Sequence, residues 1–243
     1  MKLIYLEETD STNRFAANLL KEETLEEGTV IQAAFQTAGR GQRGNSWYSS
    51  KGENLLFSIV FYPDFLFGDQ QFYLSKMISV GLFRFFNSFC NDVKIKWPND
   101  IYFQNKKIGG ILIENSLQGS EISHSIVGVG LNINQQTFPD QIPNPISLFQ
   151  ITNKKYDLQE LLQQAVHHIF CTYEELAEGN FAAINNAYID VLFRFQEIAN
   201  FKTPEGETFS GKIVDVKENG CLQIETNFRK KLFYFKEIEF LMP

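Results

Sequence analysis

A glycine-rich, cationic loop is the segment of this chain best suited to chemistry. Residues 39–47, Gly-Arg-Gly-Gln-Arg-Gly-Asn-Ser-Trp, contain three glycines and two arginines and end on a tryptophan. Glycine lets the backbone bend and approach a ligand closely, and the arginine guanidinium is a planar, permanent cation suited to carboxylates and phosphates. The segment therefore predicts a mobile loop that closes over a small anion.

The glycines at 39, 41 and 44 also match two phosphate-binding patterns, but their context argues against both. A dinucleotide-binding fold needs a helix to begin at the glycines, so that the helix N-terminus meets the pyrophosphate. Residues 45–52 are instead polar and show no helical apolar period. A P-loop would require the same helix and a lysine where Asn45 stands.

Further motifs bring more polar residues near the ends of predicted strands. Residues 96–100 read Lys-Trp-Pro-Asn-Asp, and residues 128–132 read Gly-Val-Gly-Leu-Asn. Any single cation in such a place is most simply a solvated loop charge. Considered together with the glycine-rich segments, several cations are better interpreted as converging on one anion. They are Arg40, Arg43, Lys96, Lys106 and Lys107.

Each motif also has a purely structural interpretation. Residues 11–13, Ser-Thr-Asn, would serve as a helix N-cap, and Trp97-Pro98 would form a rigid corner at a strand end. Asn99 and Asp100 would cap a turn, and the pair Gly109-Gly110 would form a bulge. At this stage both interpretations of these residues stay open.

Hydrophobic periodicity predicts the elements that position the motifs. Strands are expected at 3–6, 29–36, 54–62, 93–97, 101–103, 108–115 and 123–133, and helices after the cap at 10–13 and at about 70–89, 158–178 and 181–193. After residue 195 the pattern changes to short alternating strands, and Asn219-Gly220 predicts a hairpin turn. An α+β domain over residues 1–190, followed by a small all-β domain over 191–243, is therefore expected.

Composition limits the class of protein. The 243 residues are 44% hydrophobic, enough for one good-sized core, and carry a net charge of -7, which disfavours generic binding to nucleic acid or anionic membranes. No apolar run has transmembrane length, and no signal peptide is evident. The three scattered cysteines, Cys90, Cys171 and Cys221, show no disulfide framework or metal-ligand spacing. A cytoplasmic protein without nucleic-acid or membrane partners is expected.

The order of the motifs resembles that of biotin protein ligases. The resemblance rests on residues 39–47, 96–100, Lys107 with 109–112, and 130–132, while residues 11–13 and Gln36 also fall where that family has them. It spans residues 4–135 by motif, and the last segment resembles the family's small SH3-like β-barrel. The resemblance implies a mixed β-sheet flanked by helices, related to class II aminoacyl-tRNA synthetases and lipoate ligases.

The resemblance also implies a reaction and its residues. Biotin would be joined to AMP from ATP, with Mg²⁺, and then passed to a lysine of a biotin carboxyl carrier domain. It assigns catalysis to Lys107, Arg40 and Asp100, and ATP binding to Arg43, Asn99, Lys107 and Asn132. It assigns biotin binding to Ser11, Thr12, Asn13, Gln36, Gly39, Arg40, Gly41, Gln42, Trp47, Lys107 and Gly110. Two roles for Asp100 stay open, holding Mg²⁺ or helping to deprotonate the acceptor lysine.

The cations suit this chemistry, because a carboxylate attacking a phosphate brings two anions together. At about 4 Å the repulsion is ~4 kcal/mol in an effective dielectric of 20. Gln42 and Asn45 stand where many family members carry arginine, so this loop has less positive charge. The chain begins directly at the catalytic motifs, so we expect the monofunctional type, monomer or homodimer, without an N-terminal DNA-binding domain.

Two alternatives remain. A lipoate or octanoate ligase or transferase would share the fold but not the 96–100 motif. A non-enzymatic biotin- or nucleotide-binding module would not need Lys107 and the two arginines.

Overall fold

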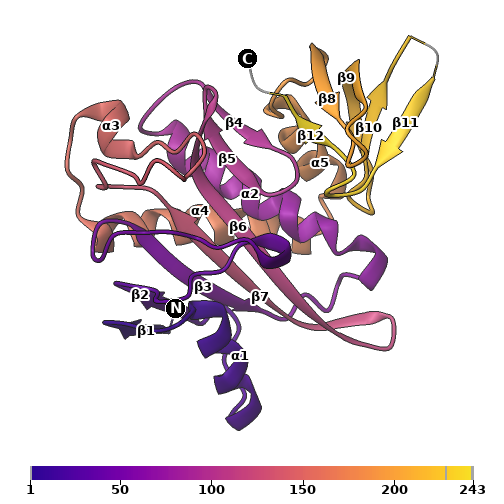
Figure 1. Cartoon of the computed structure of the whole chain (residues 1–243). Coiled ribbons are helices and arrows are strands. Elements are labelled where there is room, and N and C mark those ends of the chain that lie inside the picture. Colours follow the sequence, from indigo (N-terminus) through magenta and orange to yellow (C-terminus); the bar gives the residue numbers. More distant parts are fainter. Residues whose placement is uncertain (1, 228, 242–243) are drawn as a thin grey trace.

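The computed structural model of the protein describes residues 2–227 and 229–241 (Figure 1). Its largest unit is a seven-stranded mixed sheet in the order β1-β2-β3-β7-β6-β5-β4. These strands are Leu3–Leu6, Val30–Ala33, Leu55–Phe61, Glu121–Leu131, Lys106–Gln118, Asp100–Phe103 and Val93–Lys96 in that order. The pair β1 and β2 is parallel, and the other neighbours are antiparallel.

Helices cover both faces of this sheet, which confirms the predicted mixed sheet flanked by helices (Figure 1). Helix α1 (Thr12–Glu22) packs on β2, β3 and β7. Helix α2 (Phe72–Asn87) packs on the opposite face, with α4 (Leu158–Ala177) and α5 (Phe181–Asp190) against it. Short elements complete this part of the chain, namely two 3-10 turns at Gln42–Gly44 and Gly68–Gln70 and helix α3 at Leu148–Thr152.

Strand β3 shows how alternation divides the two faces. Leu55, Phe57, Ile59 and Phe61 belong to the larger hydrophobic core on the α2 side. Val60 belongs to a smaller core with Ala16 of α1. Because successive side chains of a strand point to opposite faces, the chemistry-bearing residues on the α1 side are separated from the main core.

The C-terminal segment forms a second sheet, antiparallel and five-stranded, in the order β11-β10-β9-β8-β12. Its strands are β8 Ile198–Lys202, β9 Thr208–Val216, β10 Leu222–Glu225, β11 Lys230–Phe233 and β12 Glu239–Phe240. The hairpin predicted around Asn219-Gly220 joins β9 and β10. Among the described residues no pairing between β11 and β12 closes this sheet into the barrel that the resemblance implied.

The two sheets are connected near residue 190, and this connection places the second sheet beside the first. Ile95 of β4 donates its N–H to the carbonyl of Val191, and Phe193 donates to the carbonyl of Ile95. The Trp97 indole N–H donates to the carbonyl of Gly220, 2.9 Å away, in the C-terminal hairpin. The division at 190/191 stays a prediction, and residues 191 and 193, which follow it, still bond to β4 of the large sheet.

A buried lysine also joins the two parts. Lys76 of α2 has no exposed surface, and its Nζ donates to Asn185 Oδ1 of α5 at 2.6 Å and to the Val216 carbonyl of β9 at 3.0 Å. Burial lowers the pKa of Lys76 to about 8, against the opposing influence of Asp215 and Glu218. A single amine therefore links α2, α5 and the C-terminal sheet.

This lysine predicts a pH dependence of stability. The folded-state pKa of about 8 lies below the ordinary value of 10.5, so between these values the unfolded chain binds the extra proton. The free energy of unfolding should therefore rise with pH in this window, by up to about 1.4 kcal/mol per pH unit. Denaturant unfolding from pH 7.5 to 10.5, compared with Lys76→Met, measures it. Equal pH slopes in the two proteins would contradict it.

Candidate active site

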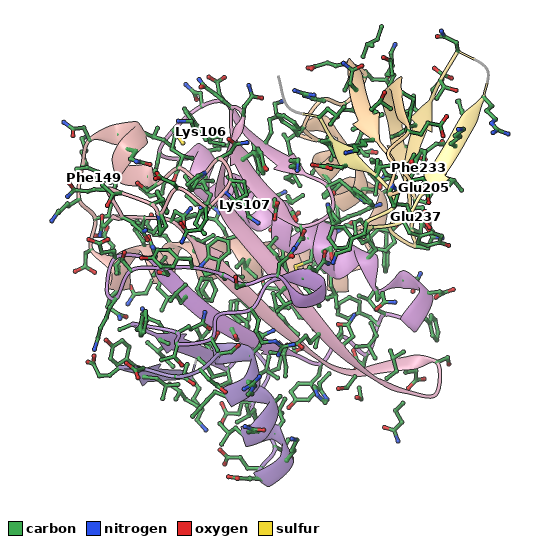
Figure 2. The ribbon with its side chains drawn as sticks, viewed as in Figure 1. Lys106, Lys107, Phe149, Glu205, Phe233 and Glu237 are labelled. Atoms are coloured by element: carbon green, nitrogen blue, oxygen red, sulfur yellow. The ribbon has the colours of Figure 1, made fainter. Side chains whose placement is uncertain are left out.

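A cavity of about 780 Å³ lies on the α1 face of the large sheet. It is bounded by the start of α1, the glycine-rich loop, strands β4 to β7 and the near edge of the C-terminal sheet. Figure 2 shows Lys107 near the middle of the molecule and Lys106 nearer its outside. The cavity lining includes most of the residues named from sequence, which are Ser11, Thr12, Asn13, Gln36, Arg40, Gly41, Gln42, Trp47, Asn99, Asp100, Lys107 and Gly110.

A polar network occupies the end of the cavity at α1. Gln36 Oε1 accepts from the Thr12 N–H at 2.8 Å and from Thr12 Oγ1 at 3.0 Å. Ser58 Oγ lies 2.7 Å from Thr12 Oγ1 and 2.6 Å from Asn13 Oδ1. Because Gln36 Oε1 is used in this way, its Nε2 donor faces elsewhere, beside Gly39. The network presents a fixed set of neutral polar groups, which suits a neutral ring that both donates and accepts.

This network decides between the two interpretations of residues 11–13. Ser11 stands at the N-cap position of α1, but its side chain makes no capping hydrogen bond. Instead the Ser11 N–H donates to Asp10 Oδ1 at 2.6 Å. Thr12 and Asn13 are buried, and their side chains bond to Gln36 and to Glu114 of β6. The three residues therefore belong to the cavity wall rather than to a simple helix cap.

Lys107 and Asp100 form an ion pair in the cavity, with Lys107 Nζ 2.7 Å from Asp100 Oδ1. A register shift between Ile101 and Tyr102 of β5 places Lys107 on the same side of β6 as Gly110. Lys107 Nζ also lies 5.5 Å from the centre of the Trp47 ring. The extra residue is Ile108, so the bulge lies just before the predicted Gly109-Gly110 pair, and the two glycines themselves are regularly paired with β5 and β7. This bulge directs the lysine into the cavity.

A second cation, Lys96, lines the wall between the two sheets. Its Nζ lies 5.0 Å from the centres of the Tyr102 and Phe240 rings. Burial lowers the pKa of Lys96, and Lys107 lowers it further, while Asp100 opposes them. Since an anion beside Lys96 would favour the charged form, this wall suits a phosphate group.

The glycine-rich loop folds back on itself as one wall of the cavity. The Gly41 N–H donates to the Asn45 carbonyl at 2.7 Å, and the Trp47 N–H donates to the Gly39 carbonyl at 2.9 Å. The Trp47 ring lies against Gly110 and Gly130, where a side chain would collide with it. These glycines are therefore needed for close approach of an aromatic ring to the sheet.

Two buried polar atoms of this loop have no hydrogen-bond partner within the described residues, Trp47 Nε1 and Gln42 Oε1. A buried donor or acceptor without a partner costs about 1–3 kcal/mol. Both residues line the cavity, so a ligand with one acceptor and one donor in reach of the loop would remove this cost.

Lys106, expected among the converging cations, is exposed and outside the cavity lining. Three of the residues assigned by resemblance are also placed differently from the rest. Asn132 does not line the cavity, and its side-chain amide donates to the carbonyls of Lys107 and Ile146. It therefore supports the backbone at Lys107. Gly39 also lies outside the lining, where a Cβ would collide with the Trp47 carbonyl. The side chain of Arg43 lies outside the described part of the structure. The binding roles of all three stay predictions.

Sequence reasoning missed several residues of the site. Ser58 is a lone polar residue in an apolar strand, and that contrast was a usable signal. Gly110 and Leu112 of β6 line the cavity, and Glu114 is the next alternate residue of the same strand. Because alternate residues of a strand share a face, the sequence could have placed Glu114 on the cavity side of the sheet. Lys202, Glu239 and Phe240 reach the cavity from the C-terminal sheet, and only the tertiary packing reveals them.

Comparison with known proteins identifies the family. Residues 5–132 match the biotin/lipoate A/B protein ligase family, and the chain belongs to this family. It is 30% identical over 244 residues to the bifunctional ligase/repressor BirA of Bacillus subtilis, covering 98% of this chain and 73% of that protein. It is 29% identical to the biotin--[acetyl-CoA-carboxylase] ligase of Paracoccus denitrificans, covering 89% of this chain and 91% of that protein.

Solved structures agree with the family assignment. The biotin protein ligase from Aquifex aeolicus in complex with biotin and ATP superposes with a TM-score of 0.82 at 28% identity. The alignment covers 100% of this chain and 99% of that one. Both the large sheet and the C-terminal sheet therefore follow the fold of that ligase.

Proposed function

We propose that this protein activates biotin with ATP to form biotinyl-5'-AMP and transfers the biotin to a lysine of a biotin carboxyl carrier domain. The observation that carries the proposal is the Lys107–Asp100 ion pair inside the cavity. The polar network of Thr12, Gln36 and Ser58 lies at one end of that cavity. Lys96 lies on its opposite wall. The arrangement supplies a neutral polar end for the ureido ring and a cationic end for the phosphates.

In the first step the biotin carboxylate oxygen attacks the α-phosphorus of ATP. The new P–O bond forms as the bond to the departing pyrophosphate breaks. Lys107 is the cation best placed to offset the repulsion between the two anions and the charge that develops on the phosphoryl group. Arg40, on the loop wall of the cavity, adds a second positive charge.

In the second step the acceptor lysine amine attacks the carbonyl carbon of biotinyl-AMP. An amide bond forms, AMP leaves with the oxygen, and the nitrogen loses a proton. The ordinary pKa of lysine, ~10.4, leaves the amine mostly protonated near neutrality. Asp100 accepts from Lys107 on one side, and its carboxylate lies in the cavity where it would receive that proton.

Mg²⁺ would accompany ATP in this site. No cluster of three or more His, Cys, Asp or Glu residues that would hold a metal ion occurs within residues 2–227 and 229–241. Mg²⁺ is commonly held by one or two carboxylates together with substrate phosphates, so a single carboxylate such as that of Asp100 is enough for this mode of binding. We infer that the nucleotide would bring most of the oxygen ligands, and that the metal would neutralise charge on the phosphates.

The acceptor is proposed as a carrier domain of a biotin-dependent carboxylase, acted on in the cytoplasm. None of the helices in the described ranges has the length and apolar character that a bilayer crossing requires.

Incubation with biotin, ATP, Mg²⁺ and a purified carrier domain should modify one lysine of that domain, as read by mass spectrometry. Adenylate formation without transfer to any carrier domain would restrict the proposal to the first step.

Gln42 provides a prediction about retention of the intermediate. Gln42 lines the cavity, and its side-chain amide nitrogen is a donor that can bond to a phosphate. Glutamine reaches a phosphate without bringing charge, whereas a charge-assisted hydrogen bond is about twice as strong as a neutral one. Gln42→Arg should therefore slow release of biotinyl-AMP, by up to ~10-fold for a gain of 1.4 kcal/mol.

The dissociation rate of preformed biotinyl-AMP from the two proteins measures this effect. Asn45→Arg serves as the comparison, since it adds the same charge at the other place where the loop lacks an arginine. An unchanged or faster rate in Gln42→Arg would mean that Gln42 does not govern retention.

A further inference from the structure

An ion pair ties the glycine-rich loop to the large sheet. Arg40 Nη2 lies 2.6 Å from Glu114 Oε1, and Arg40 Nη1 lies 3.3 Å from Glu114 Oε2. The planar guanidinium thus meets the carboxylate at both oxygens, the geometry that gives an arginine–carboxylate pair its directionality. The Trp47 ring lies against the sheet at the end of the same loop. The loop is therefore held at two points.

Glu114 is itself fixed from the other side. Asn13 Nδ2 donates to Glu114 Oε2 at 2.8 Å and to the Leu112 carbonyl at 3.3 Å. An ionised carboxylate only accepts hydrogen bonds, so it determines which way the Asn13 amide is turned. Asn13 Oδ1 then faces Ser58 Oγ, 2.6 Å away. One carboxylate thus connects the polar network at α1 with the cationic loop.

We propose that Glu114 is a positioning residue that acts through Arg40 and holds the glycine-rich loop against the sheet as the cavity wall. Its carboxylate sets where the Arg40 guanidinium lies before any ligand binds. When biotinyl-AMP is present, the same contact keeps the loop in place and slows release of the intermediate. Only this last consequence rests on the proposed function.

Limited trypsin digestion without ligand tests the first part, because trypsin cleaves after the loop residues Arg40 and Arg43. The Arg40 and Glu114 side chains are 39% and 35% exposed, so a moderate effect is expected. In Glu114→Gln, which keeps the shape and removes the charge, cleavage in the loop should be roughly 2- to 5-fold faster. Cleavage rates after Arg43, read by mass spectrometry, allow all variants to be compared at one bond.

A double-mutant cycle shows whether Glu114 acts through Arg40. Arg40→Gln should speed cleavage after Arg43 as much as Glu114→Gln does, and the double variant should be no faster than either. Glu121→Gln is the matched control, since Glu121 begins the neighbouring strand β7, is exposed, and has no ion pair in the described residues. Trypsin should cleave Glu121→Gln after Arg43 at the wild-type rate.

The ligand step is then measured as the dissociation rate of biotinyl-AMP. Glu114→Gln should release it roughly 2- to 5-fold faster, and should make no difference in the Arg40→Gln background. Additive effects of the two substitutions, or wild-type cleavage in Glu114→Gln, would overturn the proposal. A wild-type protein that does not form biotinyl-AMP would refute the proposed function, whereas the digestion result would still decide the role of Glu114.

Discussion

Replacing Lys107 by alanine is expected to slow formation of biotinyl-AMP by ~10²–10³ while the protein stays folded. The side chain is 31% exposed and its Nζ pairs with Asp100 in the cavity. Its removal therefore takes away a placed positive charge without opening the core. The Lys107 N–H still donates to the Asn144 carbonyl, so the local backbone is retained. Single-turnover formation of biotinyl-AMP from saturating biotin and ATP measures the loss.

Lys106→Ala is the matched control for this experiment. Lys106 is the preceding residue of β6 and is exposed, and Figure 2 places it farther from the middle of the molecule than Lys107. Its removal should leave adenylate formation unchanged. A well-folded Lys107→Ala protein with a near-normal rate would show that Lys107 is only a surface charge.

Adenylate formation is expected to require biotin and to fail with lipoate and octanoate. The hydrogen bonds among Thr12, Gln36 and Ser58 fix polar groups at one end of the cavity. An acid without a ureido ring would not pair with the donors and acceptors that this network leaves over, such as Gln36 Nε2. Sites built to hydrogen-bond a substrate reject analogues that lack the polar group by about 10⁴-fold or more.

The substrate choice is read as acyl-AMP formed from each of the three acids under identical conditions. Thr12→Val provides a matched variant, since it removes the hydroxyl that donates to Gln36 at similar volume. It should lower the preference for biotin. Equal adenylate formation from all three acids by the wild-type protein would contradict the assignment of this end of the cavity to the ureido ring.

The sequence predicted local elements well where a single physical signal dominates. Alternation predicted the strands at 101–103 and 108–115, and turn residues predicted the hairpin at Asn219-Gly220. Helix α3 was missed, because five residues are too few to show a helical period. Its capping box was a usable signal, since Ser147 Oγ accepts from the Gln150 N–H and the Gln150 side chain accepts from the Ser147 N–H.

The site was predictable as a set of motifs but not as a set of contacts. The motifs around Arg40, Asp100 and Lys107 do meet in one cavity. The partner of Arg40 is Glu114, 74 residues away, and a sequence gives no signal for a single pairing at that separation. The contribution of Phe240 and Glu239 from the C-terminal sheet likewise depends on how two separate sheets pack.

Biotin-dependent exchange of labelled pyrophosphate into ATP is the measurement that tests the proposed chemistry most directly. It reports the reversible first step alone and needs no carrier domain. The wild-type protein should catalyse exchange with biotin and MgATP and lose it when biotin is omitted. Tight binding of biotin without any exchange would contradict an enzymatic role and would indicate a binding module instead.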